Sequence, residues 1–299
     1  MAIFLVWGAH GHWDFVLPFR GAKLLGMILV AYCIAVSTVL FQSISHNRIL
    51  TPNIIGFDSL YVLLQAVIVY FLGTMGSSYG DSPIGFAANV GLMTLGALLL
   101  FRWMFAKEST GLTMLLLAGI VASLLFRSLT SLVMRMIDPN EFLILQDLMF
   151  ANFNSMHVAL LPHAFAAALV ASLLAWSCRK DYDALALGRE IAINLGVDYH
   201  RVVMKTLVSI AVLVSVATAL VGPLTFLGLL ASNLAYRTTQ SGKHKHVIPA
   251  AVMFSIVLVV GGQMLLERVF ALGTAVSVVI DFFGGCVFLA LLLKRGERC

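Results

Sequence analysis

The residues best suited to chemistry in this sequence are two histidines, His244 and His246, in a basic tract that reads GKHKH at residues 242–246. A zinc site needs three or four protein ligands, so two histidines do not complete one. The zinc motif H-E-x-x-H and the nucleotide-binding motif G-x-x-x-x-G-K-[ST] are both absent. We therefore expect no catalytic residues, no bound metal or cofactor, and no ATP hydrolysis by this chain. The basic tract is typical of a loop that faces lipid headgroups.

A second group of reactive residues lies within or beside long apolar stretches: Arg127, Arg135, Glu267, Arg268 and Asp281. Ionisable groups inside a membrane are costly and often functional. Such groups are compatible with the proton relay of a secondary transporter. They are equally compatible with structural ion pairs, or with side chains that face a watery cavity.

The elements that must position these residues are membrane spans. Of the 299 residues, 61% are hydrophobic and only 11% are charged, whereas a soluble domain carries about 25% charged residues. A soluble chain of this size could not bury so much apolar surface in one core. The net charge of +5 comes from basic residues in short loops between apolar runs. This is a pattern of membrane topology, so we expect no nucleic-acid partner.

A helix needs about 20 apolar residues to cross a bilayer. Runs of suitable length occupy residues 22–44, 59–75, 84–105, 112–134, 157–176, 202–221, 247–266 and 275–293. A shorter stretch at 223–236 follows Gly222 and predicts a broken or tilted ninth crossing, which is tolerated where protein or water surrounds it. The predicted fold class is all-α: a polytopic transmembrane helical bundle of about nine crossings, in one integral domain over residues 1–299.

Lysine and arginine are distributed unequally between the two sets of loops. Fourteen of the nineteen lie in one set and five in the other. Because basic residues stay on the cytoplasmic side, this asymmetry predicts an inner-membrane protein with a cytoplasmic C-terminus and, for nine crossings, an outside N-terminus.

Two segments outside the spans have structure of their own. The largest cytoplasmic segment, 178–205, has helix-forming composition over 184–195, and Gly196 is a natural helix end. On the outer side, 137–156 carries acidic residues, and Pro139 suits the first turn of a helix. We expect a short amphipathic helix in the first segment and a cap or short helix in the second.

Three stretches together resemble one family, the FecCD/BtuC-type permeases of importers for iron–siderophore complexes, haem and cobalamin. Residues 42–58, QSISHNRILTPNIIGFD, are similar to the family's Q…N-P-L-A-x-P-x-x-L-G. Residues 186–196, ALGREIAINLG, resemble its coupling segment A-L-G-x-x-x-A-x-x-L-G, and residues 222–237, GPLTFLGLLASNLAYR, resemble G-P-I-x-F-x-G-L-x-x-P-H-x-x-R. The family's Pro-His is Ser232–Asn233 in this chain. The forms NRILTP and GPLTFLGLL are most similar to a catecholate-siderophore branch.

The resemblance implies a type II ABC importer permease, whose family usually has ten spans. It implies a homologous but different permease as dimer partner, two ATPase subunits that use ATP and magnesium, and a periplasmic or lipoprotein siderophore-binding protein. Membrane lipid surrounds the bundle.

The resemblance also implies roles for individual residues. The segment expected to contact the ATPase comprises Leu185, Ala186, Leu187, Gly188, Arg189, Glu190, Leu195 and Gly196. The translocation path is expected to follow the spans 22–44 and 112–134, with path and gate residues Gln42, Asn47, Ser109, Thr110, Gly111 and Thr113. The expected docking residues for the binding protein are Arg20, Arg135 and Arg268. A self-contained proton-coupled secondary transporter is the alternative function; a neighbouring gene with a nucleotide-binding motif would favour the importer.

Overall fold

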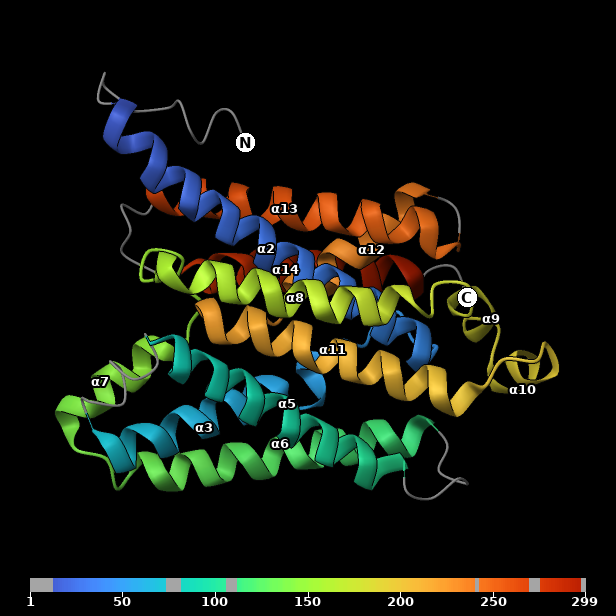
Figure 1. Ribbon diagram of the computed structural model, residues 1–299, viewed down its shortest axis with the longest axis horizontal. Coiled ribbons are helices and arrows are strands. Elements are labelled where there is room, and N and C mark those ends of the chain that lie inside the picture. The colour runs from blue at the N-terminus through green and yellow to red at the C-terminus, as the bar shows by residue number, and fades with distance from the viewer. Residues whose placement is uncertain (1–12, 74–81, 106–111, 240–241, 269–274, 297–299) are drawn as a thin grey trace.

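The computed structural model describes residues 13–73, 82–105, 112–239, 242–268 and 275–296, and every regular element in these ranges is helical (Figure 1). The long helices are α2 (Trp13–Ser45), α5 (Pro83–Phe105), α6 (Leu112–Met134), α8 (Leu161–Trp176), α11 (Tyr199–Val221), α13 (His244–Arg268) and α14 (Val276–Gly296). Shorter helices are η1 (Pro52–Ile55), α3 (Phe57–Leu72), α7 (Pro139–Leu148), η2 (Val158–Leu160), α9 (Tyr182–Leu185), α10 (Arg189–Asn194) and α12 (Leu227–Thr239).

Within the described ranges, six helices are long and apolar enough to cross a membrane, and two shorter apolar helices accompany them. Each of the eight long spans predicted from the sequence coincides with one of these helices. The predicted short crossing at 223–236 is also present as α12, which begins only at Leu227 because residues 222–226 are not helical. The all-helical prediction is therefore confirmed.

Helix α2 lies at the centre of the bundle. Of its spanning residues 83% are buried, against 22% for α6. Its neighbours are α11, α12 and α13, and α12 approaches it so closely that a Cβ atom on Gly228 would overlap the Thr38 hydroxyl. Small residues permit this close packing between membrane helices, where no hydrophobic force drives association. Side chains of α2 take part in contacts near both of its ends, Lys23 near one and Ser43 near the other.

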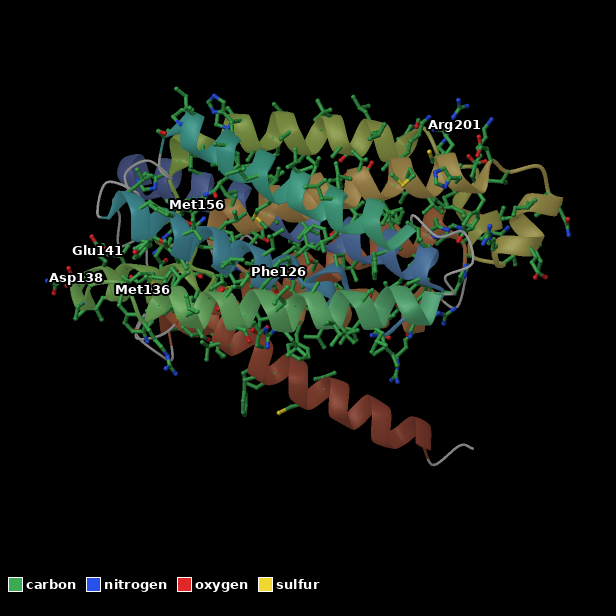
Figure 2. All side chains as sticks on the ribbon, turned by 90° about the horizontal axis from the view of Figure 1, so that it is seen from below. Phe126, Met136, Asp138, Glu141, Met156 and Arg201 are labelled. Atoms are coloured by element: carbon green, nitrogen blue, oxygen red, sulfur yellow. The ribbon has the colours of Figure 1, made fainter. Side chains whose placement is uncertain are left out.

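Two helices lie at the edge of the bundle with apolar side chains uncovered. Helix α6 exposes Leu117, Leu124 and Leu132, and α14 exposes Phe282 and Phe283. Figure 2 shows the C-terminal part of α14 diverging from the other helices. In the described part of the chain, α14 packs mainly on α12 and α13.

The two segments outside the spans lie at opposite ends of the bundle (Figure 1). At one end, Pro139 occupies the first turn of α7, as the sequence predicts. At the other end, the prediction of one helix over 184–195 is wrong, because two short helices, α9 and α10, replace it. The break falls at Gly188, whose φ of +112° is strained for any other residue.

Candidate functional site

The segment that carries α9 and α10 is anchored to the bundle by buried side chains. Leu185 and Ala192 are fully buried, and Tyr182 is nearly so. The Tyr182 hydroxyl donates a hydrogen bond to the Ala175 carbonyl over 2.8 Å, and burial raises the pKa of Tyr182 to about 12. The anchor joins the start of the segment to the end of α8, so a force on α9 reaches the spans directly.

A second connection runs through a buried histidine at the start of α13. His244 Nδ1 lies 2.6 Å from Asp183 Oδ1 of α9, and its backbone N–H donates to the same oxygen over 3.0 Å. The other ring nitrogen, Nε2, meets the Ser43 hydroxyl of α2. Three elements distant in sequence are thereby joined at one imidazole. We call Ser43, His244 and Asp183 the histidine link.

The pKa of Asp183 reports the same contact. Burial by itself raises it, but the hydrogen bonds from His244 outweigh burial and hold the pKa of this carboxyl below its usual range. The pKa of Asp183 is lower in the folded state than in the unfolded state. The contact therefore stabilises the fold at pH values above the ordinary pKa range of an aspartate. That stabilisation is lost as the pH falls through the lowered pKa.

The outer surface of the α9–α10 segment is unusually apolar. Large side chains that anchor nothing within the chain are exposed there: Leu187 (58%), Ile191 (48%), Ile193 (49%) and Leu195 (62%). Figure 1 shows α10 projecting beyond the end of α11. Several exposed large apolar side chains on one short projecting segment are typical of a surface that binds another protein.

The end of this segment has a defined geometry. Gly196 has a φ of +83° and follows Leu195, the residue that caps the end of α10. Its N–H donates to Ile193 O, and the N–H of Val197 donates to Ala192 O over 3.1 Å. This is a Schellman motif, which stops a helix abruptly at a glycine. The prediction that Gly196 ends the helix is confirmed, and the motif fixes the direction of Leu195.

At the opposite end of the bundle, a buried ion pair joins α2 to α13. The Lys23 ammonium lies 2.6 Å from Glu267 Oε1, with side-chain exposures of only 10% and 23%. Lys23 also donates to Asn154, and Gln263 donates to both Asn154 and Glu267. We call these four side chains the lysine network. Glu267 therefore belongs to a structural ion pair, which is one of the interpretations that the sequence left open.

Two of the sequence motifs meet halfway along the bundle, where helices begin and end. Asn53 of η1 donates to the Leu224 carbonyl over 2.9 Å. Thr225 donates to Asp58 Oδ2 over 3.0 Å, and the N–H of Phe226 donates to Asp281 of α14 over 3.2 Å. Side chains thus satisfy backbone groups that a continuous helix would have paired internally, as broken helices inside a membrane require.

Two of the residues predicted for the path and gate, Gln42 and Asn47, lie near the end of α2 and in the turn that follows it. Gln42 is buried and donates to the Arg48 carbonyl and to Ser232 of α12. The side-chain oxygen of Asn47 accepts from the N–H of Ile49 within the turn that follows α2. Thr113 lies in the first turn of α6, while Ser109, Thr110 and Gly111 lie outside the described residues.

The predicted docking residues lie at the end of the bundle that carries α7. Arg20 belongs to α2, close enough for its charge to act on Glu267. Arg268 is exposed at the last position of α13, and Arg135 is exposed directly after α6. These three charges come from three helices that reach the same end (Figure 1).

Sequence reasoning missed the histidine link. His244 was assigned to a basic loop, yet its ring is buried while the neighbouring His246 is exposed. The sequence carried no signal of this burial, and only the structure shows that the imidazole at the start of α13 is buried and needs a partner. That partner, Asp183, lies 61 residues away, which no local pattern reveals.

Comparison with known proteins agrees with this architecture. The model of the FecCD transport family matches residues 2–294. The chain is 46% identical to the petrobactin import system permease protein YclO of Bacillus subtilis (strain 168), over 96% of this chain and 91% of that protein. It is 33% identical to the petrobactin import system permease protein FatC of Bacillus anthracis, over 92% of this chain and 78% of that protein.

Two solved structures share the fold. An inward-facing metal-chelate type ABC transporter matches with a TM-score of 0.84 at 20% identity, covering 98% of this chain and 94% of that one. The structure of PsaBC from Streptococcus pneumoniae in complex with Fab matches with a TM-score of 0.62 at 17% identity, covering 97% and 95%. At these identities the likeness concerns the fold alone.

Proposed function

This chain belongs to the FecCD transport family, and from that premise we propose that it carries the ferric complex of petrobactin or of a closely similar catecholate siderophore. It is the membrane-spanning permease subunit of an ABC importer, and ATP hydrolysis takes place in a separate subunit. The observation that carries the substrate proposal is the 46% identity to a petrobactin permease along almost the whole chain. The family assignment replaces the alternative of a self-contained secondary transporter.

The orientation in the membrane follows from charge. The sequence assigns fourteen of the nineteen lysines and arginines to one set of loops, and the segment that carries α9 and α10 belongs to that set. We therefore propose that the end that carries α9 and α10 faces the cytoplasm, with the C-terminus, and that α7 lies outside. An ABC importer permease works with an ATPase and a binding protein. In this orientation the ATPase meets α9 and α10, and the binding protein meets the α7 end.

For the ATPase contact we propose the segment from Leu185 to Gly196. The exposed Leu187 and Leu195, together with Arg189 and Glu190, form its outer surface, while Leu185 anchors it. Ala186 carries a backbone contact to His46, in the turn that follows α2. Closure of two ATPase subunits would then move α9 and α10 as a rigid body and tilt α2 and α13.

For the dimer we propose a homologous but different permease that covers the exposed faces of α6 and α14. These faces expose Leu124 and Phe282. The path then runs between the two chains along α6, with an inner gate at Ser109, Thr110, Gly111 and Thr113. Gln42 and Asn47 are included in this proposed path because their hydrogen bonds fix the shape of the turn that follows α2.

The histidine link gives a prediction about coupling. Replacing His244 by Ala leaves Asp183 and Ser43 without their shared partner, a loss of about 1–3 kcal/mol at this joint. We expect ATP hydrolysis to continue in the assembled complex while iron transported per ATP falls several-fold. The measurement is that ratio in proteoliposomes. His246→Ala, which removes the exposed neighbour, is the control. A wild-type ratio in His244→Ala would show that the link does not transmit movement.

Binding-protein docking gives a second prediction. Arg268→Glu reverses an exposed charge at the α7 end and is expected to slow docking of the binding protein, more at low salt than at high salt. Arg201→Glu makes the same change at the opposite end, where Figure 2 shows Arg201 far from Asp138 and Glu141. Surface plasmon resonance on the complex in nanodiscs measures both variants. Equal association rates for the two variants would show that Arg268 does not take part in docking.

The substrate proposal is tested by iron uptake in cells that lack this gene, with and without a plasmid copy. Radioiron is supplied as ferric petrobactin or as a ferric hydroxamate. We expect the plasmid to restore uptake of the petrobactin complex alone. Restored uptake of the ferric hydroxamate alone would assign the chain to another substrate class.

A further inference from the structure

A groove on α6 combines features that a lipid-facing helix would not carry. It has a volume of about 480 Å³ and is lined by Leu124, Arg127, Ser128, Ser131, Leu132 and Arg135. All six side chains are exposed in the chain. Their spacing of three and four residues places them on one face of the helix. We call this surface the arginine groove.

The depth of Arg127 argues against a groove that faces only hydrocarbon. It lies seven residues before the last residue of α6, or about 10 Å inside the span at 1.5 Å per residue. An arginine at such a depth is costly unless it faces water or other charges. Ser128 and Ser131 add hydroxyl groups between Arg127 and Arg135, which completes a polar stripe that opens at the outer end.

The same stripe changes character farther along the helix. Towards the cytoplasmic end the exposed side chains on this face are Leu117, Ile120 and Val121. A charged outer part thus leads into an apolar inner part. This order suits a ligand that is attracted at the mouth and held weakly beyond it.

We propose that the arginine groove is the part of the translocation path that receives an anionic ferric chelate, with Arg127 as its deepest positive charge. The proposal rests on the proposed function, because the negative charges of the oxygens in a ferric catecholate complex outnumber the three positive charges of the iron. Arginine supplies charge and several directed N–H donors, which suits oxygen-rich anions. Arg135 at the mouth meets the chelate when the binding protein releases it.

The neighbouring acidic residues define a competing role for Arg127. Its charge acts on Asp58, and Asp281 also lies near Asp58. Both carboxylates have donors of their own, from Thr225 and from the Phe226 N–H. If Arg127 served only to balance Asp58, neutralising both residues together would restore function. If Arg127 binds the chelate, the double change would not restore it.

The test is uptake of a radiolabelled ferric catecholate by proteoliposomes that contain the complete importer and its binding protein. Arg127→Gln is expected to lower uptake about tenfold or more, because this is the size of effect expected from losing one hydrogen bond to a charged group. Arg127→Lys keeps most of the uptake. Arg127→Gln combined with Asp58→Asn stays as low as the single variant. Co-purification of the ATPase and of the partner permease at the wild-type ratio, measured for all three variants, is the control that the complex is assembled.

Two results would overturn the inference while the wild-type importer still transports the chelate: unchanged uptake in Arg127→Gln, or full rescue by the added Asp58→Asn. If the wild-type importer takes up no ferric catecholate, the proposed function itself fails and the inference fails with it.

A labelling experiment separates a watery path from a lipid surface. Ser131→Cys is made in a variant in which the four native cysteines are replaced. We expect the new thiol to react with an anionic methanethiosulfonate faster than with a cationic one, because the arginines concentrate anions. Leu129→Cys, exposed on another face of α6, is the matched control and stays unlabelled. If Ser131→Cys is as inert as Leu129→Cys, the groove faces lipid and the inference is wrong.

Discussion

Replacing Gly188 by Trp is expected to abolish transport while the permease still folds and inserts. Gly188 lies between α9 and α10, and a Cβ atom there meets nothing within 4 Å in the chain. The bulky ring therefore has room inside the permease, but it projects from the surface proposed to contact the ATPase. We expect ATP-dependent iron uptake to fall to about 1% of wild type or less, since a misplaced interface costs several factors of ten in affinity.

The control for this variant is Gly188→Ala. The φ of +112° at this position strains any residue with a Cβ atom, by roughly 1–3 kcal/mol. Gly188→Ala carries that strain without the bulk, so it is expected to keep a substantial part of the uptake. Uptake and co-purification of the ATPase are measured for both variants. Normal uptake by Gly188→Trp, or equal loss in both, would contradict steric blocking of the ATPase.

Replacing Glu267 by Gln is expected to give the largest loss of stability among single changes outside the apolar core. The change leaves the Lys23 ammonium nearly buried without its counter-charge. Breaking a buried ion pair on one side costs about 3–5 kcal/mol, and the partial exposure of Glu267 places the expected loss near 3 kcal/mol. The Tm of the purified permease in detergent, followed by intrinsic fluorescence, is the measurement.

The double variant Lys23→Met and Glu267→Met isolates the cause. It removes both charges and replaces them with apolar groups, so most of the lost stability should return. A double-mutant cycle from the two single variants and the pair gives the interaction free energy. A Tm for Glu267→Gln equal to wild type would mean that Asn154 and Gln263 satisfy Lys23 without the carboxylate.

The long helices were predictable because each depends on a property that is local in sequence. An apolar run such as 247–266 is long enough to cross a bilayer wherever it packs, and α13 follows it. Pro139 likewise starts α7 because proline suits the first turn of any helix. Hydropathy, however, does not indicate how deeply a helix is buried: α11 and α13 have the same mean hydropathy of 2.1, yet 72% of α11 and 39% of α13 are buried.

The parts that were missed depend on contacts between distant residues. The break between α9 and α10 is an exception, because it falls at Gly188, a weak helix former within an otherwise helix-forming stretch; its positive φ is visible only in the structure. The histidine link could not be predicted because it forms only when α13 folds against α9. The motifs at 42–58 and 222–237 were each visible in the sequence, but their meeting through Asn53 and Leu224 was not.

The central claim is that this chain is the permease of an ATP-driven importer, and the most direct test is iron uptake under two kinds of energy depletion. Cells with and without the gene are given a radiolabelled ferric catecholate siderophore under iron limitation. In one arm ATP is depleted while the proton gradient is maintained; in the other the gradient is collapsed while ATP is kept. We predict that uptake requires the gene, stops when ATP is depleted and survives collapse of the gradient. Gene-dependent uptake that survives ATP depletion and stops with the gradient would contradict the account.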